Sequence, residues 1–270
     1  MKKHLLLAAV LFLATANILA QTTTVVTKET VVTTTKTDDG ENVTLVQRII
    51  HNPRMVDPLP SIYYAYENML TSTFGTEAHI PLRSSSFEWG LYGTTHVLTT
   101  ENGRFGISTG LGISNAYNYL THDKVLSVDE MNGRQAFIES LNTYSSLEGH
   151  GPTNNYAHRT FLRYWSLRLP VMFQLQWKID GVPLSLAAGA ELEWRFGMRS
   201  FARYGGAKHT VSDNLNYNPV GFNVLFSLAF DDTVIFFRSG LTDMMNIRDC
   251  GDVYQMSLGF GFNFDYKISS

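Results

Sequence analysis

The sequence predicts an all-β protein, an eight-stranded antiparallel up-and-down transmembrane β-barrel. Apolar and polar residues alternate strictly over Arg163–Lys178, and period-2 alternation is typical of a strand with two different faces. Seven further segments repeat this pattern less strictly. Their connections alternate between short and long, which is typical of barrels in bacterial outer membranes.

The segment Arg163–Lys178 has the clearest pattern of the chain. Its second face is mostly polar, and its first face consists of Trp165, Leu167, Leu169, Val171, Phe173, Leu175 and Trp177. The apolar face has a tryptophan at each end, and such amphipathic rings sit at the two interfaces of a membrane. These residues therefore predict a strand that crosses an outer membrane.

The N-terminal residues 1–20 are predicted to be a secretory signal peptide. Lys2 and Lys3 precede a short apolar run that ends in small residues at Ala20, and this run is too short to span a bilayer as a helix. Residues 21–59 are predicted to form a Thr-rich flexible periplasmic segment, because nothing nearby is expected to pair with its β-prone sequence. The alternative is that this segment adds a strand to a partner protein.

The barrel is predicted to span residues 60–266, followed by a C-terminal tail at 267–270. Its strands are expected at 62–70, 86–98, 104–117, 163–178, 184–196, 220–230, 233–242 and 254–264. Proline is disfavoured inside a sheet, so a bulge is expected at Pro170 in the fourth strand.

The connections between these strands predict the orientation of the barrel. Short connections at 99–103, 179–182 and 231–232 alternate with longer ones at 71–82, 118–160, 198–219 and 244–252. In outer-membrane barrels the long loops lie outside the cell, so both termini are expected on the periplasmic rim. Residues 128–141 are expected to form a short helix within the longest loop.

Alternation alone does not say which face of the strands points inward, because a soluble barrel with an apolar interior has the same period. Eight strands leave an interior just wide enough for side chains to fill, and the many aromatic rings of the apolar faces would overfill it. The aromatic side chains are therefore predicted to face lipid. The predicted aromatic girdle consists of Trp89, Trp165, Trp177, Trp194 and Phe264.

The opposite faces of the strands carry small residues and several charges, which would then lie in the lumen. The predicted lumen charge network consists of Glu67, Glu88, Arg168, Glu191, Glu193, Arg195 and Arg238. A turn at Asp180-Gly181 would place Arg168 opposite Glu193. A buried unpaired charge is costly, so these residues are expected to pair as a structural plug. The alternative is a catalytic or proton-conducting cluster.

The sequence gives little support to enzymatic chemistry. Cys250 is the only cysteine, so neither an internal disulfide nor a multi-cysteine metal site is expected. The histidines lack metal-binding spacings, no cofactor is expected, and His96 cannot be placed beside a nucleophilic serine. We therefore predict a non-enzymatic protein without catalytic, cofactor-binding or metal-binding residues. The alternative is a lipid-modifying outer-membrane hydrolase.

Several segments resemble the PorT-like outer-membrane β-barrel proteins of Bacteroidetes. They are Ser86–Gly90, Gly106–Tyr119, Tyr164–Phe173 and Gln255–Phe264. The resemblance implies a barrel fold and a location in the outer membrane of a Gram-negative bacterium. It implies no catalytic residues, because the family defines none. The founding member takes part in protein secretion, so an accessory role in secretion is a further alternative.

The expected role is structural or in interactions, with the surface loops as the binding part. Expected partners are outer-membrane lipid, the barrel-assembly machinery, and a periplasmic or surface protein. The chain has 21 basic and 24 acidic residues, a balance that does not favour nucleic-acid binding.

Overall fold

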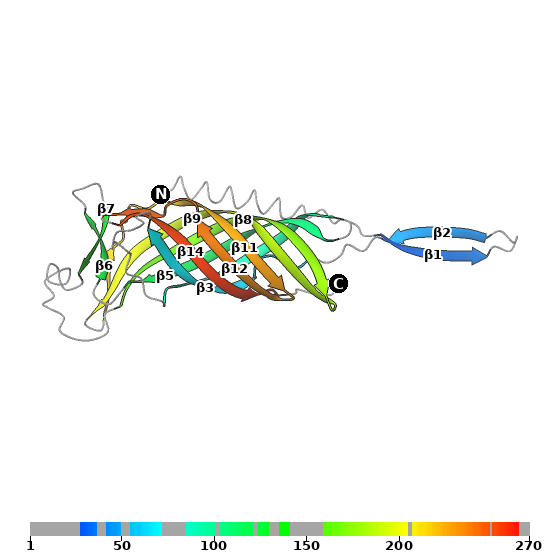
Figure 1. The fold of residues 1–270 in the computed structure, drawn as a ribbon, viewed down its shortest axis with the longest axis horizontal. Coiled ribbons are helices and arrows are strands. Elements are labelled where there is room, and N and C mark those ends of the chain that lie inside the picture. The colour runs from blue at the N-terminus through cyan, green and yellow to red at the C-terminus, as the bar shows by residue number, and fades with distance from the viewer. Residues whose placement is uncertain are drawn as a thin grey trace. The chain divides into compact units, whose positions relative to one another are not determined.

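The computed structural model describes residues 28–36, 42–49, 55–71, 85–100, 103–120, 124–129, 135–140, 159–204, 207–248 and 250–264. The expected signal peptide at 1–20 and C-terminal tail at 267–270 lie outside these residues. The chain divides into two compact units, one of residues 1–55 with 100–103 and one of residues 56–99 with 104–270. All described regular elements are strands, which confirms the all-β prediction (Figure 1). Within the described ranges, no helix has the length and apolarity needed to cross a membrane.

The first unit contains a two-stranded antiparallel hairpin. β1 (Lys28–Lys36) pairs with β2 (Asn42–Ile49), and Lys36 lies opposite Asn42. The expectation that nothing pairs locally with the Thr-rich segment is therefore wrong. Both stretches are rich in β-branched residues, and Asp39-Gly40 between them is a sequence signal for a hairpin.

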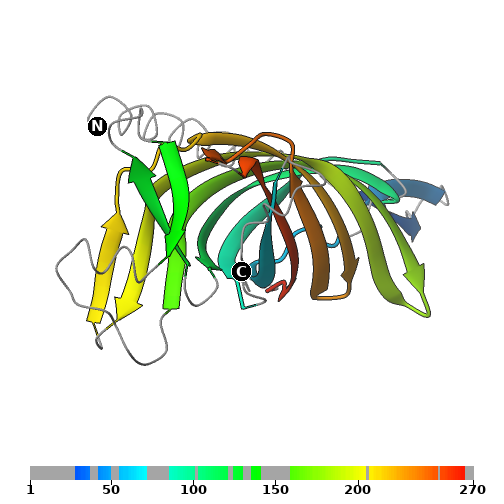
Figure 2. The ribbon, with the colours of Figure 1, turned by 60° about the vertical axis from the view of Figure 1, so that its left-hand side comes forward.

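The second unit is organised around a ring-like sheet. The strands follow each other round the ring in the order β3 (Ile62–Thr71), β4 (Phe87–Thr99), β5 (Phe105–Tyr119), β8 (Arg159–Ile179), β9 (Val182–Tyr204), β11 (Val220–Phe230), β12 (Thr233–Gly240) and β14 (Gly251–Phe262). β14 pairs with β12 on one side and with β3 on the other, so the sheet returns to its first strand (Figure 2). These elements coincide with the segments predicted as strands, and β11 has the predicted bounds.

Short strands extend the sheet at the end that carries the long connections. They are β6 (Lys124–Asp129), β7 (Gln135–Ser140), β10 (Ala207–Ser212) and β13 (Met245–Ile247). β6 pairs with β7, β10 pairs with β9, and β13 pairs with β14 and β7. The expected helix at 128–141 is therefore wrong. Asn132-Gly133 lies midway between β6 and β7, and this dipeptide favours a hairpin over a helix.

The longest pair of strands, β8 and β9, has the predicted register. Arg168 lies opposite Glu193, as a turn at Asp180-Gly181 requires. The expected bulge at Pro170 is wrong, because Pro170 stays in register opposite Glu191 and the irregularity lies between Arg163 and Trp165.

Pro170 is instead accommodated on the side of β8 that faces β5. β8 pairs with β5 at Val171 and again at Arg168, and the ladder is interrupted at the two positions between these residues. Proline has no N–H to donate to the sheet. The Thr109 hydroxyl donates to the Pro170 carbonyl over 2.9 Å, so a side chain joins the strands where the backbone ladder is interrupted.

The two faces of the ring differ in chemistry. Val171 and Phe173 on β8, Phe226 on β11 and Phe260 on β14 are exposed on the outer surface. The side chains on the inner surface are mostly polar or small and are buried, including Arg168 and Arg238. The ring therefore has a polar, filled interior and an apolar exterior.

Apolar clusters fill the interior towards both ends. At the end with the long connections, Leu120, Leu126, Met198, Met245 and Val253 belong to a buried cluster that joins β6, β7 and β13 to the ring. Towards the short turns, a second cluster consists of Leu59, Tyr63, Ala65, Tyr92, Met172, Ala187, Leu225 and Phe236. Leu59 precedes β3, so the segment before the first ring strand packs into the interior.

Candidate functional site: the interior charge network

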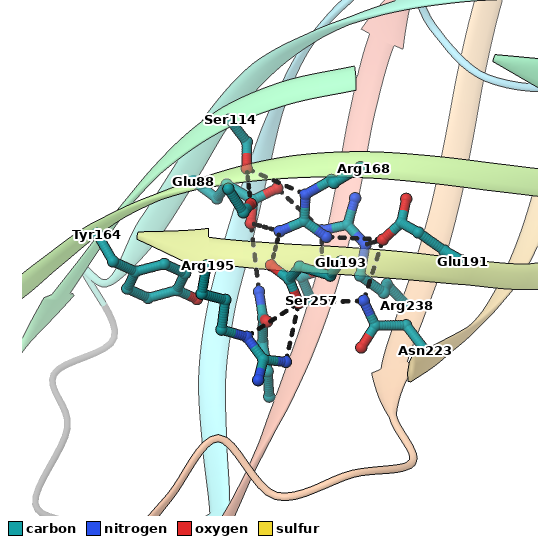
Figure 3. A network of polar contacts seen from close by, with 12 residues as sticks. Glu88, Ser114, Tyr164, Arg168, Glu191, Glu193, Arg195, Asn223, Arg238 and Ser257 are labelled. Atoms are coloured by element: carbon teal, nitrogen blue, oxygen red, sulfur yellow. Dashed lines mark hydrogen bonds and ion pairs between the residues drawn. The ribbon is translucent and has the colours of Figure 1, made fainter. Parts of the chain in front are cut away.

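Arg168 is the centre of a group of charged side chains inside the ring (Figure 3). Its guanidinium Nη2 lies 2.6 Å from Glu88 Oε2 and 2.8 Å from Glu193 Oε1, and Nη1 lies 2.7 Å from Glu191 Oε1. Its Nε donates to the Ser114 hydroxyl over 3.0 Å. Arg168 thus joins β8 to carboxylates from β4 and β9 and has partners for each of its nitrogen atoms.

Arg238 on β12 reaches the same carboxylates from the opposite side of the ring. Its Nη1 lies 2.9 Å from Glu88 Oε1, and its Nε lies 3.0 Å from Glu191 Oε1. Nη2 donates to the Tyr92 hydroxyl over 2.8 Å, and this hydroxyl donates to Glu191 Oε2 over 2.5 Å. Glu88 and Glu191 therefore each contact two guanidinium groups. Each also accepts a hydrogen bond from one tyrosine, Tyr63 for Glu88 and Tyr92 for Glu191.

Arg195 and Glu193 extend the network along β9. Arg195 donates from Nε and Nη2 to Glu193 Oε2, over 3.1 and 2.9 Å. The Asn223 amide donates to both Glu191 and Glu193. A Cβ atom at Gly221 on β11 would collide with the Arg195 guanidinium, so the missing side chain of Gly221 leaves the space that Arg195 occupies.

Glu67 lies apart from this network, although the sequence groups it with the others. It is fully buried and accepts a hydrogen bond from the Tyr164 hydroxyl. Its Oε2 has no hydrogen-bond partner, and among the described residues no cation forms an ion pair with it. All four glutamates of the predicted network were expected to pair with arginines. This expectation is wrong for Glu67, whose hydrogen-bond partner is Tyr164.

The arrangement matches three carboxylates, Glu88, Glu191 and Glu193, with the three arginines. Each of these carboxylates contacts two guanidinium groups at ion-pair distance. Carboxylates held in this way are poor bases and nucleophiles, because their lone pairs already accept charge-assisted hydrogen bonds. The geometry suits a structure that fixes strand positions better than a reaction centre.

A second polar group lies nearer the short turns and was not recognised from the sequence. His96 Nδ1 on β4 lies 2.8 Å from the Ser108 hydroxyl on β5, and His96 Nε2 lies 3.0 Å from Asp57 Oδ1. The order serine, histidine, acid is that of a hydrolase triad. Ser108 is completely buried, however, and also contacts Gln174 over 3.2 Å.

This position does not suit lipid hydrolysis. A nucleophile that acts on membrane lipid has to reach the lipid, whereas Ser108 points into the filled interior. The neighbouring contacts tie the segment before β3 to the ring: the Gln174 amide donates to the Val56 carbonyl, and the Val56 N–H donates to Gln176 Oε1 over 2.7 Å. The group around His96 therefore belongs to the packing of this segment.

The residues predicted as an aromatic girdle lie on the outer surface. Trp89 and Trp165 stack edge to face with ring centroids 5.8 Å apart, near the end with the long connections. Trp194 on β9 lies two residue pairs further from this end than Trp165, opposite Leu167. Trp177 and Phe264 are exposed towards the other end. The rings thus lie at two levels, one towards each end.

The described residues contain no group of three or more histidine, cysteine, aspartate or glutamate side chains arranged to hold a metal ion. No family model matches the chain, and no curated protein matches it. The resemblance to the PorT-like family therefore has no support from these comparisons. Among solved structures the chain is similar to Ail, the attachment invasion locus protein of Yersinia pestis, with 16% identity, a TM-score of 0.31, and coverage of 75% of this chain and 95% of that chain.

Proposed function

We propose that the ring-like sheet is an eight-stranded transmembrane barrel in the outer membrane of a Gram-negative bacterium. In this proposal the protein is non-enzymatic and has a structural or interaction role. The observation that carries it is the reversed distribution of polarity. Phe173 is 64% exposed on the outside, whereas Arg168 is 1% exposed on the inside.

This distribution fits lipid as the surrounding solvent. Soluble proteins rarely expose large contiguous apolar surfaces, because such surfaces associate. A closed sheet satisfies its own backbone hydrogen bonds, which is the requirement for crossing a bilayer with strands. Aromatic rings at two levels correspond to the girdles that such barrels place at the membrane interfaces.

The interaction surface in this proposal is the end with the long connections. β6, β7 and β13 lie there beyond the ring and pack on the apolar cluster beneath them, and β10 extends the sheet beside β9 at the same end. Surface loops on a rigid scaffold are a common place for binding. The opposite end, with the short turns, would face the periplasm and any partner there.

Membrane insertion is the first test. The protein should remain with outer membranes after extraction with carbonate, and a protease added to intact cells should cut within 118–160 or 198–219. Cleavage restricted to residues 21–45 would contradict the orientation, and release by carbonate would contradict the barrel itself. Deleting the gene and comparing surface and secreted proteins then tests the interaction role against the accessory role in secretion.

Enzymatic activity is tested separately with Ser108, since that residue has the only contact with a histidine that resembles a hydrolase site within the described residues. Purified protein in vesicles should not release fatty acids from phospholipid. Release that disappears in Ser108→Ala would support the hydrolase alternative.

A further inference from the structure

The outer surface of β8, β9 and β10 carries a group of basic residues at the end with the long connections. We call this group the cationic patch: Arg159, Arg163, Arg199, Arg203 and Lys208. The strand register places these residues opposite one another. Arg159 lies opposite Arg203, Arg163 opposite Arg199, and Lys208 opposite Arg203. Like charges directly opposite each other destabilise a sheet, so the patch is unfavourable unless something neutralises it.

Aromatic rings lie between and below these cations. The Phe161 and Phe201 rings pack with centroids 5.2 Å apart, and Lys208 Nζ lies 3.7 Å from the Phe201 centroid. The Arg163 guanidinium lies 5.3 Å from the Tyr117 ring centroid and 5.7 Å from that of Trp165. Such cation–π contacts hold the cations in place against an apolar surface. They do not supply a negative charge.

No carboxylate among the described residues forms an ion pair with the cationic patch. Arg163 Nε donates to the neutral Asn115 side chain over 3.2 Å. Burial, followed by the positive charges of Arg163, Arg203 and Arg199, lowers the pKa of Lys208. The cations therefore repel one another across this surface, and an anion bound among them would relieve the repulsion.

The position of the cationic patch along the axis of the barrel indicates which anion it would bind. Trp165, next to Arg163 on the same face of β8, stacks against Trp89 on the outer surface. Tryptophan rings mark the boundary between the hydrocarbon and the headgroups of a bilayer. Arg163, Arg199 and Arg203 lie beyond Trp165 towards the long connections, at the level of the headgroups.

We propose that the cationic patch binds the phosphate groups of an anionic lipid in the outer leaflet of the membrane. This inference rests on the proposed membrane location. Arg163, Arg199 and Arg203 bind the phosphates, because a guanidinium matches a phosphate with two parallel hydrogen bonds. Lys208 adds a point charge, and Phe161 and Tyr119, whose rings lie 5.5 Å apart, provide the apolar surface beneath.

The test uses the full-length protein in phosphatidylcholine nanodiscs, which contain no net anionic lipid. Bis-phosphorylated lipid A is titrated into the discs and its binding is measured by native mass spectrometry. Arg199→Gln/Arg203→Gln should weaken binding by roughly thirtyfold, since each cation near a charged surface contributes about a factor of five. The matched control is Arg104→Gln/Lys178→Gln, which removes two exposed charges at the opposite rim and should leave binding unchanged.

Any of the following outcomes would overturn the proposal. They are equal binding of lipid A from which the phosphates have been removed, an equal loss in the control variant, and displacement of the lipid by inorganic phosphate at the same concentration. The charge-conserving Arg199→Lys/Arg203→Lys should keep most of the affinity. Equal weakening in the lysine and glutamine variants would show that charge at this patch does not drive binding.

A photoreactive lipid A on the wild-type protein provides a test that does not depend on the folding of variants. Cross-links should map to 159–165 and 199–210, and cross-links spread evenly round the ring would contradict the patch. Failure of the proposed function gives a different result, because the wild-type protein would then not insert into nanodiscs at all.

Discussion

Arginine occurs in two contrasting surroundings in this protein. Inside the ring, Arg168, Arg195 and Arg238 are each held by carboxylates at distances of 2.6 to 3.1 Å. On the outer surface, Arg163 and Arg199 lie opposite each other, and Arg163 has neutral and aromatic neighbours. The interior shields charge from water, so opposite charges have to be built into the chain there. At the surface, solvent or lipid can supply the opposite charge.

Replacement of one interior arginine should have the largest effect. Arg168→Met leaves three buried carboxylates with fewer partners and should lower the free energy of unfolding by about 3–5 kcal/mol. Arg163→Met on the outer face of the same strand should cost about 0–1 kcal/mol. Urea unfolding in lipid vesicles measures both, and similar losses would remove the distinction between the two surroundings.

A double-mutant cycle refines this prediction. Arg168→Met with Glu193→Leu should cost less than the sum of the single changes, because the two side chains are in direct contact. Recovery should nevertheless be incomplete, since Glu88 and Glu191 also lose Arg168. Strict additivity would show that the Arg168–Glu193 pair does not form.

Arginine introduced on the outer surface tests whether that surface faces lipid. Val171→Arg lies near the middle of β8 and should cost about 2–4 kcal/mol, whereas Ile179→Arg at the end of the same strand should cost about 0–1 kcal/mol. Both residues are exposed and on the same face. The two variants are compared by unfolding in vesicles, and equal costs in vesicles would indicate that no hydrocarbon layer covers Val171.

The isolated carboxyl group of Glu67 should give a smaller effect. Tyr164→Phe removes its hydrogen-bond donor and should cost about 1–3 kcal/mol. Tyr117→Phe on the outer surface is the control and should change stability little. Glu67→Gln keeps an acceptor for Tyr164 and carries no charge, so it should be tolerated. A loss with Glu67→Gln as large as with Arg168→Met would reveal a cation partner for Glu67.

The smallest effect is expected at Ser108. Ser108→Ala removes hydrogen bonds with His96 and Gln174 and should cost about 0.5–1.5 kcal/mol, with unchanged biological function in the deletion strain. Thermal unfolding and complementation measure the two effects. Loss of complementation by a protein that unfolds normally would give this buried serine a chemical role.

Local features of the sequence predicted much of the ring. The alternation over 220–230 gives the bounds of β11, and the turn at Asp180-Gly181 gives the pairing of Arg168 with Glu193. In a short hairpin the turn determines which residues pair, so the register of neighbouring strands can be predicted from the sequence. The same kind of signal, Asn132-Gly133, lies between β6 and β7, and it favours the observed pair of strands over the helix expected at 128–141.

Contacts across the ring could not be predicted in the same way. Arg238 and Glu88 form a hydrogen bond although 150 residues separate them in the sequence. Which residues meet across the ring depends on the diameter of the ring and on how far each strand is shifted along the ring axis. Glu67 illustrates the limit, because alternation places it inside but does not show that Tyr164 will be its neighbour. The group of His96, Ser108 and Asp57 also depends on the path of the segment before β3.

The contact between Arg238 and Glu88 has a consequence for how the protein folds. These residues belong to β12 and β4, which become joined through β14 and β3 only when the last strand pairs with the first. Until then, Arg238 cannot reach Glu88 in this way, although Arg168 can already pair with Glu191 and Glu193 on the neighbouring strand β9. Completion of the network therefore requires closure of the ring. A partly assembled sheet cannot enter hydrocarbon without exposing its charges to lipid.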